Sequence, residues 1–179
     1  MKRIVLLAAL AAIAIPASAS FADDVTGTVT VNGTVADRCL FTTGSVVLNI
    51  GEMAQAAGGN AGKLNTTSVT SQNAQLTGWC NGTAATIAVQ ANALTNAASA
   101  PTGFDNKVDY TATATAHPTS GDVAVSDSST SAGASSPSTV GIFTSNIDVS
   151  FTTPASPTGG LLVAGSYTGS VVVTLSPAT

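Results

Sequence analysis

The sequence predicts an all-β protein, an antiparallel β-sandwich, and three observations lead to this fold class. Short stretches rich in valine, isoleucine and threonine alternate between apolar and polar residues with a period of two, as half-buried strands do. Turn-forming residues separate these stretches at intervals of roughly 8–15 residues. No stretch carries the 3.6-residue period of a long amphipathic helix, so two packed sheets are the simplest way to bury the apolar faces.

The alternation predicts the individual elements. Strands are expected over residues 25–35, 46–50, 64–70, 74–80, 86–91, 107–116, 146–152 and 167–175. Residues 52–63 contain paired glycines and favour at most a helical turn. Asn81-Gly82 predicts a hairpin turn, and the polar residues 117–139 predict a long exposed loop or an irregular hairpin.

The first 22 residues have the three-part pattern of a secretory signal peptide. Lys2 and Arg3 precede an apolar run over residues 4–15, and small residues offer cleavage after Ala22 or, alternatively, after Ala19. The run would span only about 18 Å as a helix, short of the ~30 Å of a bilayer core, which argues against a membrane anchor. We therefore expect residues 1–22 to be a signal, 23–36 an N-terminal strand and 37–179 the sandwich domain.

The amino-acid composition argues against several classes of function. Charged residues make up 8% of the chain, and the part after the expected signal carries three basic side chains (Arg38, Lys63 and Lys107) against nine acidic ones. A surface that follows phosphates cannot be built from three cations, so nucleic acid is not expected as a partner. The single histidine, His117, stands in a polar stretch, where we expect a solvated loop residue. We expect no enzymatic activity, cofactor or metal site.

The two cysteines predict a structural disulfide. Cys39 and Cys80 form an even pair in a chain with an export signal, and disulfides are the default for such pairs in an oxidising compartment. Their spacing does not fit a redox Cys-x-x-Cys motif, and no second cluster of metal ligands stands nearby. Trp79, beside Cys80, is expected to pack near this disulfide.

Two stretches resemble a known family. The run Gly27-Thr-Val-Thr-Val-Asn-Gly33-Thr-Val-Ala-Asp-Arg-Cys39, followed by Gly44-Ser-Val-Val-Leu-Asn-Ile-Gly51, is similar to the N-terminal third of chaperone–usher fimbrial subunits. That group includes type 1 pilins and spore coat protein U-like subunits. Thr77-Gly-Trp-Cys80 is similar to their second-cysteine strand, and the ending 162–175 resembles the last strand of the spore coat U-like subunits.

The resemblance implies a mechanism. Such subunits are immunoglobulin-like sandwiches that lack their last strand, and the open groove is filled by a periplasmic chaperone and then by the N-terminal extension of the next subunit at an outer-membrane usher. Transferred to this chain, Val25, Gly27, Val29 and Val31 would form the donor strand, with Gly33 extending the same face. The groove would be bordered by Val171, Val173 and Leu175. The expected location is the periplasm in transit and then the cell surface, in a fimbrium.

Two alternatives remain open at this point. Residues 25–35 could instead be the first strand of a complete, monomeric sandwich. The protein would then be a secreted surface protein that binds a ligand such as a carbohydrate. The two functions differ in one physical property, since a strand-donating subunit has a vacancy between its sheets and a monomeric binding domain does not.

Overall fold

The computed structural model describes residues 24–178, so the expected signal peptide over residues 1–22 lies outside the described residues. The chain divides into two units, residues 1–34 and residues 35–179. In the first unit, the described residues 24–34 form neither strand nor helix, and every one of their side chains is exposed. The strand expected over residues 25–35 is therefore not formed within this chain.

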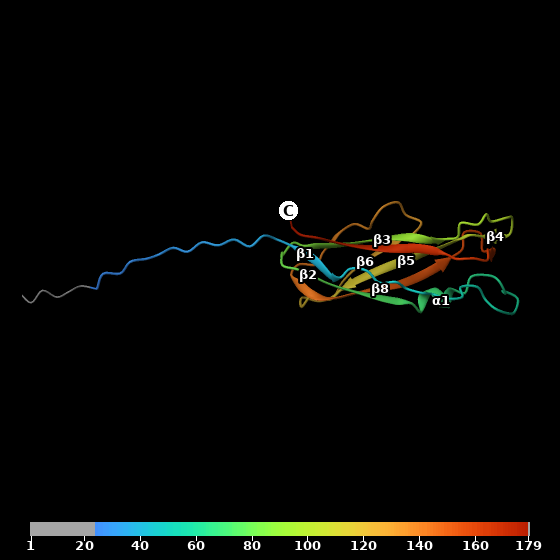
Figure 1. Ribbon diagram of the computed structural model, residues 1–179, viewed down its shortest axis with the longest axis horizontal. Helices are drawn as coiled ribbons and strands as arrows, with labels where there is room; N and C mark the ends of the chain where they lie inside the picture. Colours follow the sequence, from blue (N-terminus) through green and yellow to red (C-terminus); the bar gives the residue numbers. More distant parts are fainter. Residues whose placement is uncertain (1–23, 179) are drawn as a thin grey trace, which may run out of the picture. The chain divides into compact units, whose positions relative to one another are not determined.

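The regular secondary structure of the second unit is almost entirely β-strand (Figure 1). The five-residue helix α1 (Thr66–Thr70) is the one α-helix among the described residues, where no helix is long and apolar enough to span a bilayer. The strands are β1 (Cys39–Thr43), β2 (Asn73–Cys80), β3 (Thr86–Thr95), β4 (Phe104–Asp105), β5 (Lys107–Ala116), β6 (Val123–Ser128), β7 (Ser138–Thr139), β8 (Phe143–Ala155), β9 (Leu161–Leu162) and β10 (Thr168–Ser176).

The strands pair in the order β1-β2-β8-β5-β3-β10, with β6 beside β5 and β7 beside β3. All of these pairings are antiparallel, and only the two-residue strands β4 and β9 pair in parallel. β3 joins β5 through two residue pairs at one end, so the β3–β10 ribbon can fold over the rest of the sheet. The predicted all-β antiparallel sandwich is confirmed.

Small apolar side chains fill the core between the layers. β5 shows the period-two pattern throughout, because Val108, Tyr110, Ala112, Ala114 and Ala116 are buried while the residues between them are half-buried. β3 and β8 supply the larger side chains, including Ile87, Val89, Ile147 and Val149. A second cluster of Met53, Leu64, Val69 and Val108 closes one end.

Two predicted strands are absent for identifiable reasons. Residues 64–70 contain helix α1, because the side chain of Asn65 caps it by accepting a hydrogen bond from Thr67 N and because Val69 is buried. Residues 46–50 have the alternating pattern but form no strand, since no strand edge pairs with them within the described chain.

Two connections also differ from expectation. The stretch 117–139, expected as a long exposed loop or an irregular hairpin, contains β6 and β7. β6 pairs antiparallel with β5, where Thr113 faces Ser126, so the long loop is wrong for this part and residues 117–122 connect a β5–β6 hairpin. Asn81-Gly82 does not form a hairpin turn between paired strands, because β2 pairs with β1 and β8 whereas β3 pairs with β5, β7 and β10. These residues instead carry the chain from one layer to the other.

Candidate functional site

An elongated groove of about 1170 Å³ opens between β10 and the segment that follows β1. One wall is formed by residues 162–173 and the other by residues 44–54. The floor is apolar and belongs to five elements; it consists of Val69, Ala74, Leu76, Leu94, Tyr110, Val149 and Phe151. Glu52 is the one charged residue among the described residues that line the groove, so the site suits an uncharged, apolar occupant.

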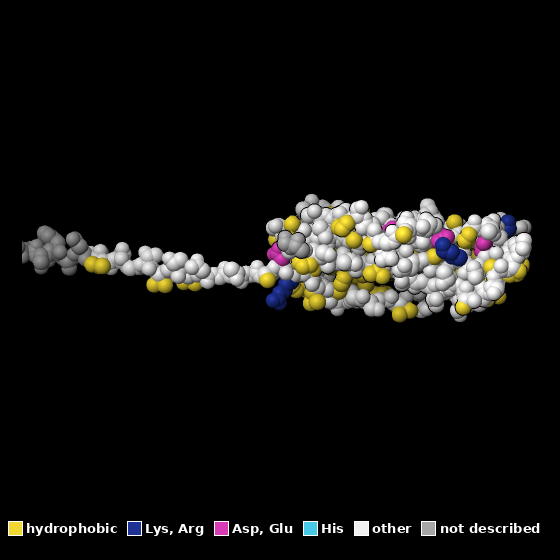
Figure 2. All heavy atoms as spheres, turned by 90° about the horizontal axis from the view of Figure 1, so that it is seen from above, with side chains coloured by type: hydrophobic (Ala, Val, Ile, Leu, Met, Phe, Trp, Pro, Cys, Tyr) yellow, Lys and Arg dark blue, Asp and Glu magenta, His cyan; other side chains and the backbone are white. Residues whose placement is uncertain are grey.

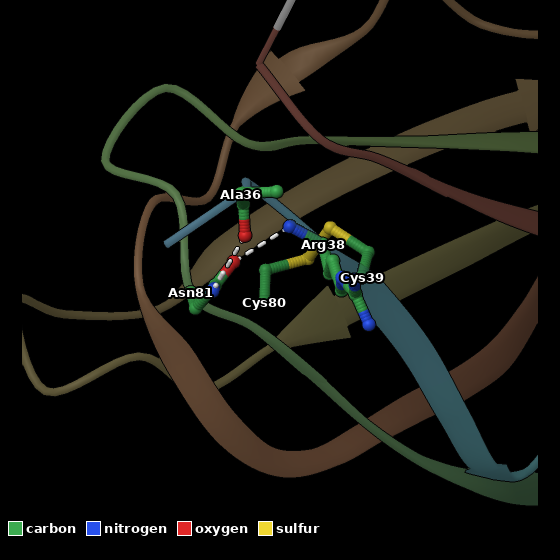
Figure 3. Close-up of a disulfide and its surroundings, with 5 residues drawn as sticks. All are labelled: Ala36, Arg38, Cys39, Cys80 and Asn81. Carbon is green, nitrogen blue, oxygen red and sulfur yellow. Dashed lines mark hydrogen bonds between the residues drawn. A yellow bond between two sulfur atoms is a disulfide. The ribbon is translucent and has the colours of Figure 1, made fainter. Parts of the chain in front are cut away.

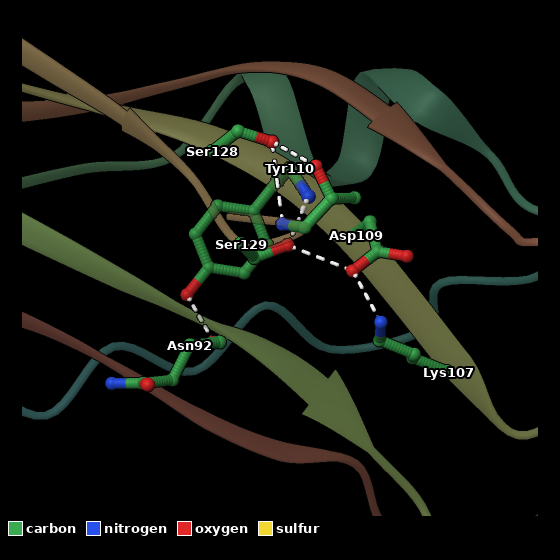
Figure 4. Close-up of polar contacts among 7 residues, drawn as sticks. Asn92, Lys107, Asp109, Tyr110, Ser128 and Ser129 are labelled. Carbon is green, nitrogen blue, oxygen red and sulfur yellow. Dashed lines mark hydrogen bonds and ion pairs between the residues drawn. The ribbon is translucent and has the colours of Figure 1, made fainter. Parts of the chain in front are cut away.

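Two aromatic rings make part of this floor rigid. Tyr110 of β5 and Phe151 of β8 meet edge to face, with ring centroids 5.4 Å apart and an interplanar angle of 65°. Polar contacts hold Tyr110 from its other side, where its backbone N–H donates to Ser129 Oγ and Ser129 Oγ donates to Asp109 (Figure 4). Lys107 completes this chain with an ion pair to Asp109.

The hydroxyl of Tyr110 connects the floor to the β3–β10 ribbon. It donates to the carbonyl oxygen of Asn92 in β3 at 2.7 Å and lies 3.2 Å from the carbonyl oxygen of Ser170 in β10. Burial raises the pKa of Tyr110 to about 12, so the hydroxyl stays a donor at any physiological pH. The position of the β10 wall is therefore fixed by a contact from within the core.

β10 has an unpaired backbone edge along this groove. It pairs with β3 on one side, and among residues 24–178 no strand pairs with its other side. Val171 and Val173 line the groove next to this edge. Leu175 lies beyond it, where its Cδ1 would be 3.2 Å from a Cβ placed on Gly78, and so closes that end. The three residues predicted to border an acceptor groove thus share one face of β10.

The opposite edge of the same ribbon is covered. Asp127 Oδ2 accepts from Ala91 N at 2.8 Å, and Ser135 bonds Val89 through both its Oγ and its backbone N–H. β7 and β5 pair with the two ends of β3. The stretch 117–139 therefore satisfies one edge of the ribbon, whereas the β10 edge beside the apolar groove is left open.

The disulfide lies where the chain enters the sandwich. Cys39 and Cys80 are bonded and face each other directly in the β1–β2 pairing, so the predicted disulfide is confirmed. Asn81 holds the residues just before it: its Oδ1 accepts from Arg38 N at 2.6 Å and its Nδ2 donates to Ala36 O (Figure 3). The chain leading to the N-terminal segment is thus fixed at its base.

The predicted donor residues lie in the first unit and are fully available to a partner. Val25, Val29 and Val31 are 96%, 87% and 89% exposed, and Gly27 is exposed as well. Each of these three exposed valine side chains would contribute about 1.5–3 kcal/mol of stabilisation if it were buried.

A buried carboxylate shapes the far end of the groove wall. Asp105 is 4% exposed and accepts from the Thr158 hydroxyl, from Thr158 N and from Gly160 N. Burial raises the pKa of Asp105, but these hydrogen bonds together outweigh that effect and hold it below the usual value. The Tyr167 hydroxyl donates to the backbone carbonyl oxygen of Asp105. This bond connects wall residues 162–167 to the hydrogen-bonded group around Asp105.

A second, shallow hollow of about 460 Å³ lies near the disulfide end, and Trp79 and His117 are among the residues that line it. Trp79 alternates with the buried Cys80 along β2, so it lies on the outer face of the sheet, and it lines this hollow together with Cys80. His117 is also not a free loop residue, because it bridges Asp122 and Asp148 at 2.8 and 2.9 Å. Its ring nitrogens are occupied by these contacts, and no cluster of three metal-ligating side chains was found among the described residues.

Sequence reasoning missed most of the floor. Tyr110 and Phe151 lie in the strands predicted over 107–116 and 146–152, but the alternating pattern does not place them at a groove. Residues 46–50 were expected as a strand and residues 52–63 as at most a helical turn. The apolar residues at 46–48 are the signal in the sequence, and the structure shows that Val46 and Val47 are exposed and have no partner strand among the described residues.

The chain matches no protein-family model, and neither its sequence nor its structure has a significant match among curated proteins or solved structures. The outer surface gives little indication of which kind of partner the protein binds. The face shown in Figure 2 is mostly uncharged and polar, with scattered apolar patches and few charged side chains.

Proposed function

We propose that this protein is an exported structural subunit of a bacterial surface filament, assembled by strand donation. The observation that carries the proposal is the asymmetry of the β3–β10 ribbon. Its β3 edge is satisfied by Asp127, Ser135 and short strand pairings, and its β10 edge stands open above an apolar groove. A sheet edge of this kind binds an extended peptide through main-chain hydrogen bonds and pockets for alternate side chains.

The occupant that fits best is the segment 25–35 of a second copy. β10 has nine residues, or about 30 Å at the rise of a strand, and the eleven residues of 25–35 extend over about 36 Å. Residues 25–36 carry no charge, which matches a groove lined by one carboxylate. Their valines share one face, as insertion between two sheets requires.

Head-to-tail contacts of this kind propagate. The donor precedes β1 and the acceptor groove lies beside β10, so one copy can donate and accept at once, and the contact gives a filament unless it closes into a ring. The disulfide fits an oxidising compartment such as the periplasm. As the family resemblance implies, a periplasmic chaperone would cover the groove before assembly, an usher would export the subunit, and the filament would serve adhesion or biofilm formation.

Complementation between two full-length variants tests the proposal. Val29→Asp with Val31→Asp disables the donor and leaves the groove intact; Val171→Asp disables the groove and leaves the donor intact. Each variant alone should be unable to polymerise, and an equimolar mixture should form one-to-one dimers and stop there. Size-exclusion chromatography with light scattering distinguishes monomers, dimers and polymers.

Matched controls use the opposite strand faces. Thr28→Asp with Thr30→Asp adds the same charges to the other side of the donor, and Thr174→Asp adds one to the outward face of β10. Both should still polymerise. A wild-type chain that remains monomeric at high concentration would contradict the filament and favour the monomeric ligand-binding alternative.

A further inference from the structure

One tripeptide occurs twice in this chain, in two opposite environments. Asn32-Gly33-Thr34 lies in the first unit and Asn81-Gly82-Thr83 in the second, and they contain the two Asn-Gly dipeptides of the sequence. Asparagine before glycine is prone to spontaneous deamidation, because glycine has no side chain to shield the backbone nitrogen that attacks the asparagine side chain. The two copies therefore expose the same chemistry to different surroundings.

Asn32 has the freedom that this reaction needs. Asn32 and Gly33 are exposed and belong to neither a strand nor a helix. A Cβ placed on Gly33 would have no heavy atom within 4 Å beyond its chain neighbours. The reaction requires the Asn32 backbone to leave the extended conformation and bring the Gly33 nitrogen to the side-chain carbonyl carbon, and the described residues around it leave that rotation free.

Asn81 is held against the same reaction (Figure 3). Its Oδ1 accepts from Arg38 N at 2.6 Å, its Nδ2 donates to Ala36 O at 3.1 Å, and its backbone N–H donates to Arg38 O. Gly82 is buried, and a Cβ placed on it would lie 3.1 Å from Oδ2 of Asp37. Ring closure at Asn81 would have to break these hydrogen bonds, and the Asp37 carboxylate would oppose the loss of a proton from the Gly82 nitrogen.

We propose that Asn32-Gly33 is a site of spontaneous deamidation, which ages every copy whose N-terminal segment is unpaired. The Gly33 nitrogen gives up its proton and bonds to Asn32 Cγ, the bond from Cγ to Nδ2 breaks, and the amide group leaves as ammonia with that proton. Water then opens the resulting succinimide ring and leaves either aspartate or isoaspartate at position 32. Water is the one co-reactant, and no group is oxidised or reduced.

Both products impair the segment as a strand donor, a consequence that rests on the proposed function. Isoaspartate carries the main chain through its side-chain carbon, so an extra methylene interrupts the period-two register that insertion between sheets requires. Aspartate adds a charge to residues 25–36, which otherwise have none. A segment paired in the groove of a second copy is held extended by main-chain hydrogen bonds, so assembled copies are protected while unassembled copies lose their donor.

Mass spectrometry of the full chain tests the site. The variant Val171→Asp, whose groove is disabled, is kept folded at mildly alkaline pH and digested after increasing times. The peptide that contains residue 32 should lose its amide at least about tenfold faster than the peptide that contains residue 81, a difference of about 1.4 kcal/mol in activation free energy. In urea with the disulfide reduced, the two rates should approach each other, because the tripeptide is the same. Equal rates in the folded chain would overturn the inference.

Peptides of residues 25–35 test the effect on assembly. The receptor is the full chain with Val29→Asp and Val31→Asp, whose groove is unaltered and whose folding is checked by cooperative unfolding. One peptide has the natural sequence, one has isoaspartate at position 32, and the control has Asn32→Gln, which keeps an amide but would need a larger ring to react. The natural and control peptides should bind alike, and the isoaspartate peptide more than about tenfold weaker.

A saturating amount of receptor should also slow deamidation of the natural peptide. Equal binding of the isoaspartate peptide, or a deamidation rate that the receptor leaves unchanged, would overturn the ageing effect and leave strand donation standing. If the natural peptide does not bind to the folded receptor, the proposed function itself fails. The comparison of positions 32 and 81 does not involve the groove, so the two failures are distinguishable.

Discussion

The Tyr110 hydroxyl lies between two carbonyl oxygens on neighbouring strands, Asn92 O at 2.7 Å and Ser170 O at 3.2 Å. One core side chain thus fixes both the floor of the groove and the position of the strand whose edge is open. An edge held in place before a partner arrives costs less entropy to pair than a mobile one.

Tyr110→Phe tests this link. Loss of the hydroxyl should lower the free energy of unfolding by about 1 kcal/mol, because one part-buried hydrogen bond is removed without a change in ring packing. It should also weaken binding of the 25–35 peptide, since β10 loses a contact. Urea denaturation and peptide titration measure the two effects. Thr113→Val is the control, because its hydroxyl contacts Ser126 Oγ in β6 and Thr113 does not line the groove. Unchanged peptide affinity in Tyr110→Phe would refute the role of Tyr110.

Asp127→Ala should destabilise the protein by about 1–3 kcal/mol, because it leaves the N–H of Ala91 without an acceptor on a buried edge. It should also promote association through the newly exposed β3 edge. Asp127→Asn keeps an oxygen at the same place and should retain most of the stability. Denaturation midpoints measure the stability and light scattering measures the association. If the alanine variant is as stable as the asparagine variant, the hydrogen bond from Asp127 to the β3 edge does not contribute to stability.

Stability should depend on pH through His117. The hydrogen bond to Asp122, and then that to Asp148, raises the pKa of His117 above its usual 6.5. A raised pKa in the folded state stabilises the fold at pH values below the unfolded pKa, and the contribution is lost as pH rises through the folded pKa. The urea midpoint of the wild type relative to His117→Gln should therefore fall as the pH rises above about 6.5.

The contribution of Asp148 to stability depends on pH in the opposite direction. Hydrogen bonds from Gln75 and then from His117 lower its pKa, so its contribution is present above the unfolded value of 3.8 and is lost as pH falls through the folded value. The difference in urea midpoint between the wild type and His117→Gln should therefore also decrease at acidic pH. Parallel pH profiles of the two proteins would show that the bridge from His117 to the two aspartates does not contribute.

Removal of the disulfide should cost roughly 4 kcal/mol, the chain-entropy value for a cross-link between residues 41 positions apart. The double variant Cys39→Ser with Cys80→Ser serves for the measurement, because a single variant leaves a reactive thiol. Guanidinium unfolding with and without reductant compares it with the wild type. If the reduced wild type is as stable as the oxidised one, the small-residue core alone holds the fold.

The sequence by itself determined the fold class, several strands and the cross-link. Residues 107–116 form a strand with the predicted bounds, and the predictions over 146–152 and 167–175 overlap β8 and β10, because alternation reports which side chains share a face. The pairing of Cys39 with Cys80 followed from there being only two cysteines.

Tertiary structure decided which edges have partners. Residues 46–50 alternate as well as many strands do and yet form none, whereas the polar stretch 123–128 forms β6 because β5 stands beside it. Asn65 and Val69 made a helix turn where alternation favoured a strand. Period and composition belong to a segment, but pairing belongs to two segments far apart in the chain. For that reason the groove, its floor and the open edge of β10 could be seen only in the folded molecule.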